Sequence, residues 1–281
     1  ILSVDTHTGL IRHTEDVHNE LKSANPYTLW LKKNTIRIES TLQGEIEPEL
    51  MSEEELQLHQ KYYSVSFEER DQVLRPLAET GQEAVGSMGD DTPMAVLSNL
   101  QRPVFDYFRQ QFAQVTNPPI DPLRESIVMS LETCLGAEQN IFEDSEDHAR
   151  RIAMSSPVLS PSKFRQLVEF EHQAFPRQTL SLHYADASIS LHEAINRLAD
   201  DAEQAVRDGA VILVLSDRGL AKGQLTVQSL LATGAVHHRL IEKGLRCDTN
   251  LIIETAAARD SHQIATLFGY GATAVYPYLS Y

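Results

Sequence analysis

The chain of 281 residues contains only two cysteines, Cys134 and Cys247, and they lie far apart in the sequence. No Cys-x-x-Cys pair occurs, which excludes a zinc or iron–sulfur framework built from this chain alone. So few cysteines are typical of a reducing compartment, and we predict a cytoplasmic location. No apolar run approaches the length of a membrane-spanning helix, and the first residues show no signal-peptide pattern.

Basic residues are also scarce. There are 24 Lys and Arg against 40 Asp and Glu, so the formal charge is −16. Binding to a nucleic-acid backbone or to an anionic membrane requires a basic face. We therefore predict neither nucleic acid nor membrane as a partner and interpret the acidity as a source of solubility.

Common sequence motifs of catalytic sites are absent too. The sequence contains no HExxH, GxSxG, GxxxxGK[ST] or GxGxxG. The adjacent His237 and His238 face different sides of an expected helix, which favours a surface position over a metal site. The glycines of "GYGATA" near the end fit a helix stop before a strand. We predict no catalytic, cofactor-binding or metal-binding residue in this chain.

Mostly helical patterns, with frequent prolines, fill the first part of the chain. The stretch "ILSVDTHTGLIR" alternates around a turn and predicts a β-hairpin. Two short helices should follow, interrupted at Pro26. Two capping boxes, Ser52 with Glu55 and Ser66 with Glu69, each predict the start of a helix, and Pro76 should kink the second of these helices before Gly81.

The last hundred residues alternate between strand and helix with short connections. Strands are expected over 180–184, 210–216, 249–254 and 272–276, separated by helices that begin near Ser190, Val227 and Ile264. This order predicts an α/β fold: a parallel sheet with flanking helices that resembles an incomplete or altered (β/α) barrel.

The stretch "SMGDDTPMAVLS" combines small residues with two carboxylates. Asp90, Asp91 or Thr92 can cap a helix whose apolar face includes Val96 and Leu97, and this explanation is favoured over a catalytic carboxylate pair. The preceding "VGSMG" allows a close backbone approach to another segment, a ligand or a passage.

The stretch "QVTNPPIDPLRES" predicts a rigid, uncharged loop. Its prolines hold Thr116 and Asn117 extended, and Asp121 with Pro122 should start a helix that runs through Leu131. The loop suits either hydrogen bonding to a small neutral molecule or a tight turn between helices.

Charged residues follow two of the expected strands: Asp217 and Arg218 follow Ser216, and Thr255 follows Glu254. Ligands of parallel α/β proteins bind at such strand ends. One hypothesis is therefore a free-standing α/β barrel-type enzyme that acts on an anionic metabolite through Asp217, Arg218 and Glu254. Helix capping and ion pairing explain the same residues equally well.

Three long stretches resemble one known family. "LAETGQEAVGSMGDDTPMAVLS", "VFDYFRQQFAQVTNPPIDPLRES" and "ETAAARDSHQIATLFGYGATAVYPYLSY" are similar to the central domain of the glutamate synthase large chain. The resemblance assigns residues 1–40 to the end of a glutaminase domain and its linker. It assigns 41–281 to the central domain, with a helical part over 41–175 and a βαβ part over 176–281.

The resemblance implies a division of labour within a longer enzyme that makes glutamate from glutamine and 2-oxoglutarate. A glutaminase domain releases ammonia, and a domain with FMN and a 3Fe-4S cluster reduces the iminoglutarate that forms. The central domain connects them and carries neither cofactors nor a nucleophile. An electron-donor subunit or ferredoxin is the implied external partner, and the choice among NADPH, NADH and ferredoxin depends on residues outside this chain.

The resemblance also implies a role for the two unusual loops, which meet near the constriction of the family's ammonia tunnel. It assigns tunnel lining to Met88, flanked by Ser87 and Gly89, and to Thr116 with Asn117. Ammonia must move as the neutral species, because ammonium loses its hydration at a steep cost in a narrow pore. Asp90 and Asp91 then cap the helix that holds the loop. A buried corner without a passage, in a pure interaction module, is the alternative.

Overall fold

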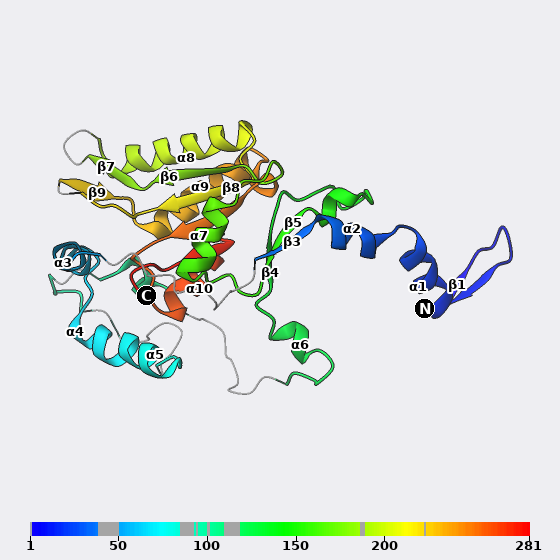
Figure 1. Ribbon diagram of the computed structural model, residues 1–281, viewed down its shortest axis with the longest axis horizontal. Coiled ribbons are helices and arrows are strands. Elements are labelled where there is room, and N and C mark those ends of the chain that lie inside the picture. Colours follow the sequence, from blue (N-terminus) through cyan, green and yellow to red (C-terminus); the bar gives the residue numbers. More distant parts are fainter. Residues whose placement is uncertain are drawn as a thin grey trace.

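A computed structural model shows a body built on a parallel sheet, with an N-terminal arm projecting from it (Figure 1). The structure describes residues 2–38, 51–84, 93, 95–99, 102–109, 119–185, 189–221 and 223–281.

Four parallel strands form the central sheet, in the order β11-β10-β8-β6. They are β6 (Arg177–Ser181), β8 (Ile212–Ser216), β10 (Asn250–Glu254) and β11 (Ala274–Tyr276). Every residue of β8 and β10 is buried, as expected for strands with both faces covered. The α/β prediction with a parallel sheet is confirmed, and the described strands form an open sheet without barrel closure.

Helices α8 (Leu191–Arg207), α9 (Ser229–Glu242) and α10 (Ser261–Gly269) pack on one face of this sheet, and α7 (Pro161–Glu169) packs on the other. Alternate side chains of each strand serve the two faces. Leu213 and Leu215 join the three-helix side, whereas Ile212 and Val214 join the α7 side. The predicted cap at Ser190 is present, because its hydroxyl accepts a hydrogen bond from the Glu193 amide.

A second sheet covers part of the α7 side. Its order is β3-β5-β4, from β3 (Thr35–Ile38), β5 (Arg151–Met154) and β4 (Thr133–Leu135). These strands were not predicted, because they are only three or four residues long and lie in a part of the chain with mostly helical patterns. The strand predicted over 180–184 is broken at Leu182, where β6 ends and β7 (His183–Ala185) begins an antiparallel pair with β9 (Gln224–Thr226).

The arm follows the prediction closely. Strands β1 (Leu2–Val4) and β2 (Ile11–His13) form the antiparallel hairpin, and α1 (Thr14–Ser23) and α2 (Tyr27–Asn34) are separated at Pro26. Neither helix buries a residue within the described chain.

The two predicted capping serines start the next helices. Ser52 caps α3 (Glu53–Tyr62) and Ser66 caps α4 (Phe67–Glu69). The effect of Pro76 appears as a π-helical turn over Arg70–Leu74, followed by α5 (Arg75–Thr80). Proline lacks the amide hydrogen of the regular helix ladder, so the turn before it widens.

Two helix predictions need correction. Residues 95–99 include a turn, and Val96 and Leu97 are exposed where an apolar helix face was expected. The helix after Asp121 is short, α6 (Glu125–Val128), although the Asp121 carboxylate does accept bonds from the amides of Leu123 and Arg124. Short 3₁₀ turns occupy Val104–Tyr107, Glu146–Ala149 and Arg246–Asp248. Within the described ranges, no helix combines the length and apolarity that a membrane crossing needs.

Arg246, which has no acidic partner among the described residues, holds the amino ends of the strands. Arg246 donates to Nδ1 of His237 at 3.0 Å and to the carbonyls of Thr249 and Gly271 at 2.7 and 2.8 Å. Gly271 has φ +108°, and a Cβ there would lie 2.3 Å from the His237 ring. This close approach explains a glycine of "GYGATA". His237 is a structural acceptor, and His238 is exposed.

Acidification should therefore weaken the fold through His237. Burial, with the charge of Arg246, lowers the pKa of His237, so the unfolded chain takes up the proton first as the pH falls through about 6.5. This contribution to stability is present above that pH and is lost below it. The variant H237N keeps an acceptor oxygen but does not titrate.

The free energy of unfolding, measured with denaturant between pH 7.5 and 5, should fall more steeply for the parent chain than for H237N. Parallel curves for the two proteins would show that His237 does not titrate differently in the folded state.

Candidate functional site

The carboxyl ends of β8 and β10 bring the predicted charged residues together. The register pairs Glu254 with Ser216, so the residues after each strand begin at the same level. Ser216, Asp217, Glu254 and Thr255 are all buried, and the side chain of Arg218 is 30% exposed. These residues lie at the strand ends where the sequence placed them, and the structure brings the two groups side by side.

The Asp217 carboxylate makes hydrogen bonds within the domain. Its side chain is fully buried, with one carboxylate oxygen bonded by the Thr255 hydroxyl and the other by the Ala256 amide at 3.0 Å. Burial raises the pKa of Asp217, and these hydrogen bonds oppose the rise. The carboxylate therefore fixes the start of the loop after β10.

Glu254 and Arg218 are placed differently. The Ser216 hydroxyl donates to Oε2 of Glu254 at 2.6 Å, and an Arg218 nitrogen lies 3.6 Å from Oε1. Burial raises the pKa of Glu254, while Ser216 and Arg218 lower it. The Arg218 guanidinium also lies 5.2 Å from the ring centre of Tyr278, within the range of a cation–π contact.

Both residues line a cavity of about 520 Å³ on the α7 side of the sheet, here called the aromatic cavity. Its walls include stacked rings: Phe164 lies 4.4 Å from Tyr276, and Tyr276 lies 6.2 Å from Tyr281, centroid to centroid. Its polar lining includes Arg165, Glu169, Arg218 and Glu254. A cavity of this size accommodates a small organic ligand.

A second space of about 470 Å³, here called the polar cavity, is lined by Tyr63, Arg102, Phe105, Asp217 and Arg259 among others. The Tyr63 hydroxyl is buried without a hydrogen-bond partner among the described residues. Burial and the charge of Asp217 raise the pKa of Tyr63, so its hydroxyl stays protonated. Such an orphan donor suits a small neutral acceptor.

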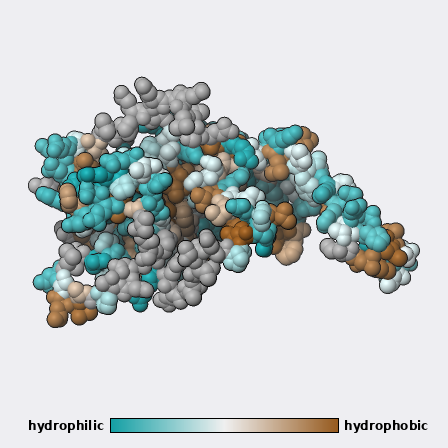
Figure 2. Space-filling model, turned by 90° about the horizontal axis from the view of Figure 1, so that it is seen from below, coloured by the Kyte–Doolittle hydropathy of each residue, from teal (hydrophilic) through white to brown (hydrophobic). Residues whose placement is uncertain are grey.

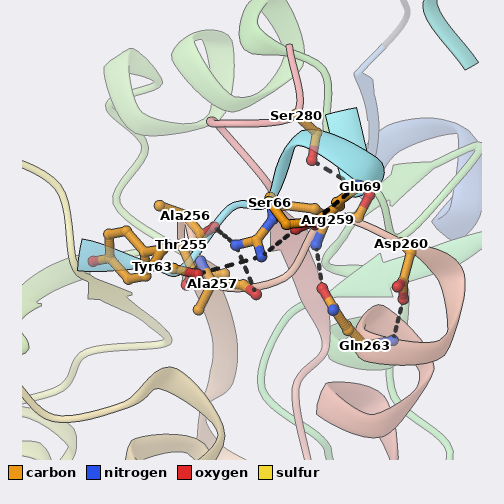
Figure 3. A network of polar contacts seen from close by, with 10 residues as sticks. All are labelled: Tyr63, Ser66, Glu69, Thr255, Ala256, Ala257, Arg259, Asp260, Gln263 and Ser280. Carbon is orange, nitrogen blue, oxygen red and sulfur yellow. Dashed lines mark hydrogen bonds and ion pairs between the residues drawn. The ribbon is translucent and has the colours of Figure 1, made fainter. Parts of the chain in front are cut away.

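A buried ion pair joins the helical segment to the strand ends (Figure 3). Arg259, whose side chain is 2% exposed, donates to both carboxylate oxygens of Glu69 at 2.6 and 3.1 Å. It also donates to the carbonyl of Ala256 at 2.8 Å, and its amide donates to Gln263. The sequence analysis missed Arg259, and it read Glu69 only as part of a capping box. The Ser66 half of that box forms, whereas the Glu69 carboxylate binds Arg259.

The residues predicted to line a tunnel lie outside the described residues. Ser87, Met88 and Gly89 fall in 85–92, together with Asp90 and Asp91, and Thr116 and Asn117 fall in 110–118. Cys134 and Cys247 are both free thiols. Across the part of the chain that the structure covers, no group of His, Cys, Asp and Glu is arranged to hold a metal ion.

Fold and site together define an α/β domain whose strand ends are largely occupied by internal polar contacts. A family model for the glutamate synthase central domain matches residues 58–281, and the chain belongs to this family.

Curated glutamate synthases align with the whole chain. It is 40% identical to the chloroplastic ferredoxin-dependent glutamate synthase of Oryza sativa subsp. japonica over 286 residues. It is 37% identical to the NADPH glutamate synthase large chain of Azospirillum brasilense over 284 residues, and 36% identical to that of Bacillus subtilis (strain 168) over 284 residues. The chain is covered completely in each case, but it spans only 17%, 19% and 18% of these relatives, respectively.

Loss of the buried cation should destabilise the domain strongly. R259M leaves the Glu69 carboxylate, whose side chain is only 21% exposed, without its cation, and we expect a loss of about 3 kcal/mol in the free energy of unfolding. The control R75M removes an exposed pair with Asp71 and should cost less than about 1 kcal/mol.

Chemical denaturation measures both variants. The double variant E69Q/R259M should recover part of the loss, because no charge is then left unpaired. Equal unfolding midpoints for R259M and R75M would contradict a stabilising role for the ion pair.

Proposed function

We propose that this chain connects a glutaminase domain to an FMN- and 3Fe-4S-containing domain within a glutamate synthase, and that it lines part of the ammonia passage between them. The family match over residues 58–281 carries this proposal. Residues 1–40 then end the glutaminase domain and form its linker, and 41–175 and 176–281 are the two parts of the central domain. The enzyme as a whole makes glutamate from glutamine and 2-oxoglutarate in the cytoplasm.

Similarity to these relatives does not identify the electron donor of the proposed enzyme. The rice relative is named ferredoxin-dependent and the Azospirillum relative is named for NADPH, yet their identities to this chain are 40% and 37%. Ferredoxin or a donor subunit therefore contacts residues outside this chain in the proposed assembly.

The exposed apolar residues of the arm support a connecting role. Leu2, Val4, Leu10 and Ile11 of the hairpin are each more than half exposed, as are Leu21, Leu29 and Leu31 in the two helices. Figure 2 shows hydrophobic residues gathered at the end of the arm. An extended apolar surface of this kind is stable when another domain covers it. The preceding glutaminase domain is the proposed cover.

A second exposed group surrounds α6. Leu123, Ile127, Met129 and Leu131 are between 63% and 90% exposed, and they form one stretch of chain. Two separate apolar surfaces, on the arm and at α6, fit a domain that contacts more than one neighbour.

The conduit role has indirect support from the segment between the two proposed lining loops. The 3₁₀ turn Val104–Tyr107 connects residues 85–92 with 110–118 and packs at the strand ends: Phe105 is fully buried, and its carbonyl contacts His262 at 3.1 Å. The same turn lines the polar cavity. In the sequence, the proposed lining residues Met88 and Thr116 lie on either side of this anchored turn.

The alternative of a free-standing enzyme acting on an anionic metabolite loses one of its three residues. Asp217 is fully buried and hydrogen-bonded, so only Arg218 and Glu254 line the aromatic cavity. Turnover of a small anion by this chain alone would favour that alternative over the connecting role.

The connecting role predicts a purified chain without flavin or cluster. Its visible absorption spectrum should be featureless, and it should release no ammonia from glutamine, because the proposal places the nucleophile and both cofactors elsewhere. A yellow or brown preparation, or glutaminase activity, would count against the proposal.

The passage is tested in the full-length enzyme. M88W should block transfer, and T116V should remove a hydrogen-bonding side chain, so both should raise the ratio of glutamine hydrolysed to glutamate formed severalfold. Synthesis from free ammonium should change less. The control V96W places the same ring at a residue that is 90% exposed and should leave the ratio near one. Unchanged coupling in M88W and T116V would end the tunnel assignment.

A further inference from the structure

A groove, here called the α2 groove, lies between helix α2 of the arm and the segment that runs into the 3₁₀ turn Glu146–Ala149 (Figure 1). Its volume is about 380 Å³. Its lining includes Tyr27, Trp30 and Leu31 from α2, and Ile141, Glu143 and Asp144 from the facing segment. The groove shares no described lining residue with the two cavities at the strand ends.

Large apolar side chains border the α2 groove and face solvent. Leu31 is 56% exposed, Ile141 is 83% exposed, and Phe142 beside it is 90% exposed. The rings of Tyr27 and Trp30 pack edge to face, with 5.5 Å between their centroids, and form an aromatic wall. An apolar surface gathered around a groove is typical of a site that a partner covers.

Two carboxylates of the groove bond only to neutral groups within the described chain. The side-chain amide of Asn140 donates to Glu143 at 2.9 Å. Asp144 accepts hydrogen bonds from the Tyr27 hydroxyl at 3.1 Å and from the Asn25 side-chain amide at 3.3 Å. These bonds hold both carboxylates at the groove, and no basic side chain of the described chain pairs with either of them.

The acids that follow in the sequence already have cations. The Lys33 ammonium lies 3.5 Å from a Glu146 oxygen, and an Arg150 nitrogen lies 2.9 Å from an Asp147 oxygen. In this stretch, the charge without a cation therefore belongs to the two carboxylates that line the groove. Charge complementarity favours an occupant with a basic side chain, which can bond a carboxylate and lie against the Trp30 ring.

The apolar surface of the arm continues into the α2 groove. Leu29 and Leu31 belong to the exposed residues that the preceding domain is proposed to cover, and Leu31 also lines the groove. One neighbour can therefore cover both surfaces. The curated relatives have ample chain for such a neighbour, because this chain spans only 17% to 19% of their length.

We infer that the α2 groove docks a segment of the preceding glutaminase domain in which a lysine or arginine lies among apolar side chains, with the basic group bound by Glu143 and Asp144. This inference rests on the proposed connecting role and adds the chemistry of the contact. It includes no chemical step.

Photocrosslinking in the full-length protein tests the docking site. Phe142 is replaced with p-benzoylphenylalanine, which reacts on irradiation with the C–H bonds that it contacts. The product should join position 142 to a segment that precedes residue 1 in the same polypeptide, and mass spectrometry of the digest identifies that segment. The matched control places the same group at Phe67 of α4, which is 65% exposed, and should not give this product.

Neutralising the groove should weaken the docking. E143Q/D144N should lower the yield of the product severalfold, and about 0.5 M NaCl should lower it similarly, because salt screens exposed charges. E146Q/D147N removes the same number of charges from acids that already have cations, and should change the yield little. Replacing the identified basic residue with glutamate should lower the yield in the parent protein and restore it in combination with E143K/D144K.

The inference is overturned if position 142 of the folded protein gives no crosslink, joins only residues 1–281, or joins a second copy of the chain. Equal yields from E143Q/D144N and E146Q/D147N overturn it as well, and thermal unfolding of each variant separates lost docking from lost folding. A full-length protein that does not couple glutamine hydrolysis to glutamate formation contradicts the proposed function. A coupled enzyme without the crosslink contradicts the docking site alone.

Discussion

The parallel register of β8 and β10 is the constraint on which the rest of the structure depends. It ends both strands at one level, so Ser216 lies beside Glu254 and Asp217 lies beside the loop that begins at Thr255. Buried carboxylates are stable only when they are hydrogen-bonded or paired. Asp217 meets this requirement by binding the Thr255 hydroxyl and the Ala256 amide, and in doing so it fixes the path of the chain after β10.

Along that path, Arg259 comes to lie beside Glu69, the last residue of α4. The guanidinium satisfies the carbonyl of Ala256 and the carboxylate of Glu69 together, so a loop of the sheet and a helix almost two hundred residues earlier share one charged group. The two cavities flank this region. One is polar and contains the Tyr63 hydroxyl, which has no hydrogen-bond partner among the described residues, and the other is aromatic and contains Arg218 with Glu254. The domain thus combines a rigid centre with two small spaces at its strand ends.

The chain belongs to the glutamate synthase central domain family, and the buried polar groups at its strand ends mostly bond to one another. The chain is less than a fifth of its relatives' length, and its arm and α6 expose apolar side chains that an isolated domain would bury. Such surfaces are the kind that other parts of a longer protein cover.

Local sequence patterns were sufficient to predict the capped helices and the buried central strands. Serine caps at Ser52, Ser66 and Ser190 start helices where a hydroxyl meets a backbone amide three residues on, and the apolar runs of β8 and β10 are buried on both faces. These features depend on neighbours in sequence. The strands β3, β4 and β5 were missed, because they are short and lack both the turn that marks the β1–β2 hairpin and the strand–helix alternation that marks β11.

Tertiary structure alone decided the roles of the charged residues. The sequence placed Asp217, Arg218 and Glu254 at strand ends, but only packing set Asp217 toward the polar cavity and the other two toward the aromatic cavity. The partner of Glu69 is 190 residues away, and no local pattern indicates it. Periodicity and capping are properties of adjacent residues, whereas the charge state and partners of a buried group depend on whichever distant segments the fold brings within hydrogen-bonding distance.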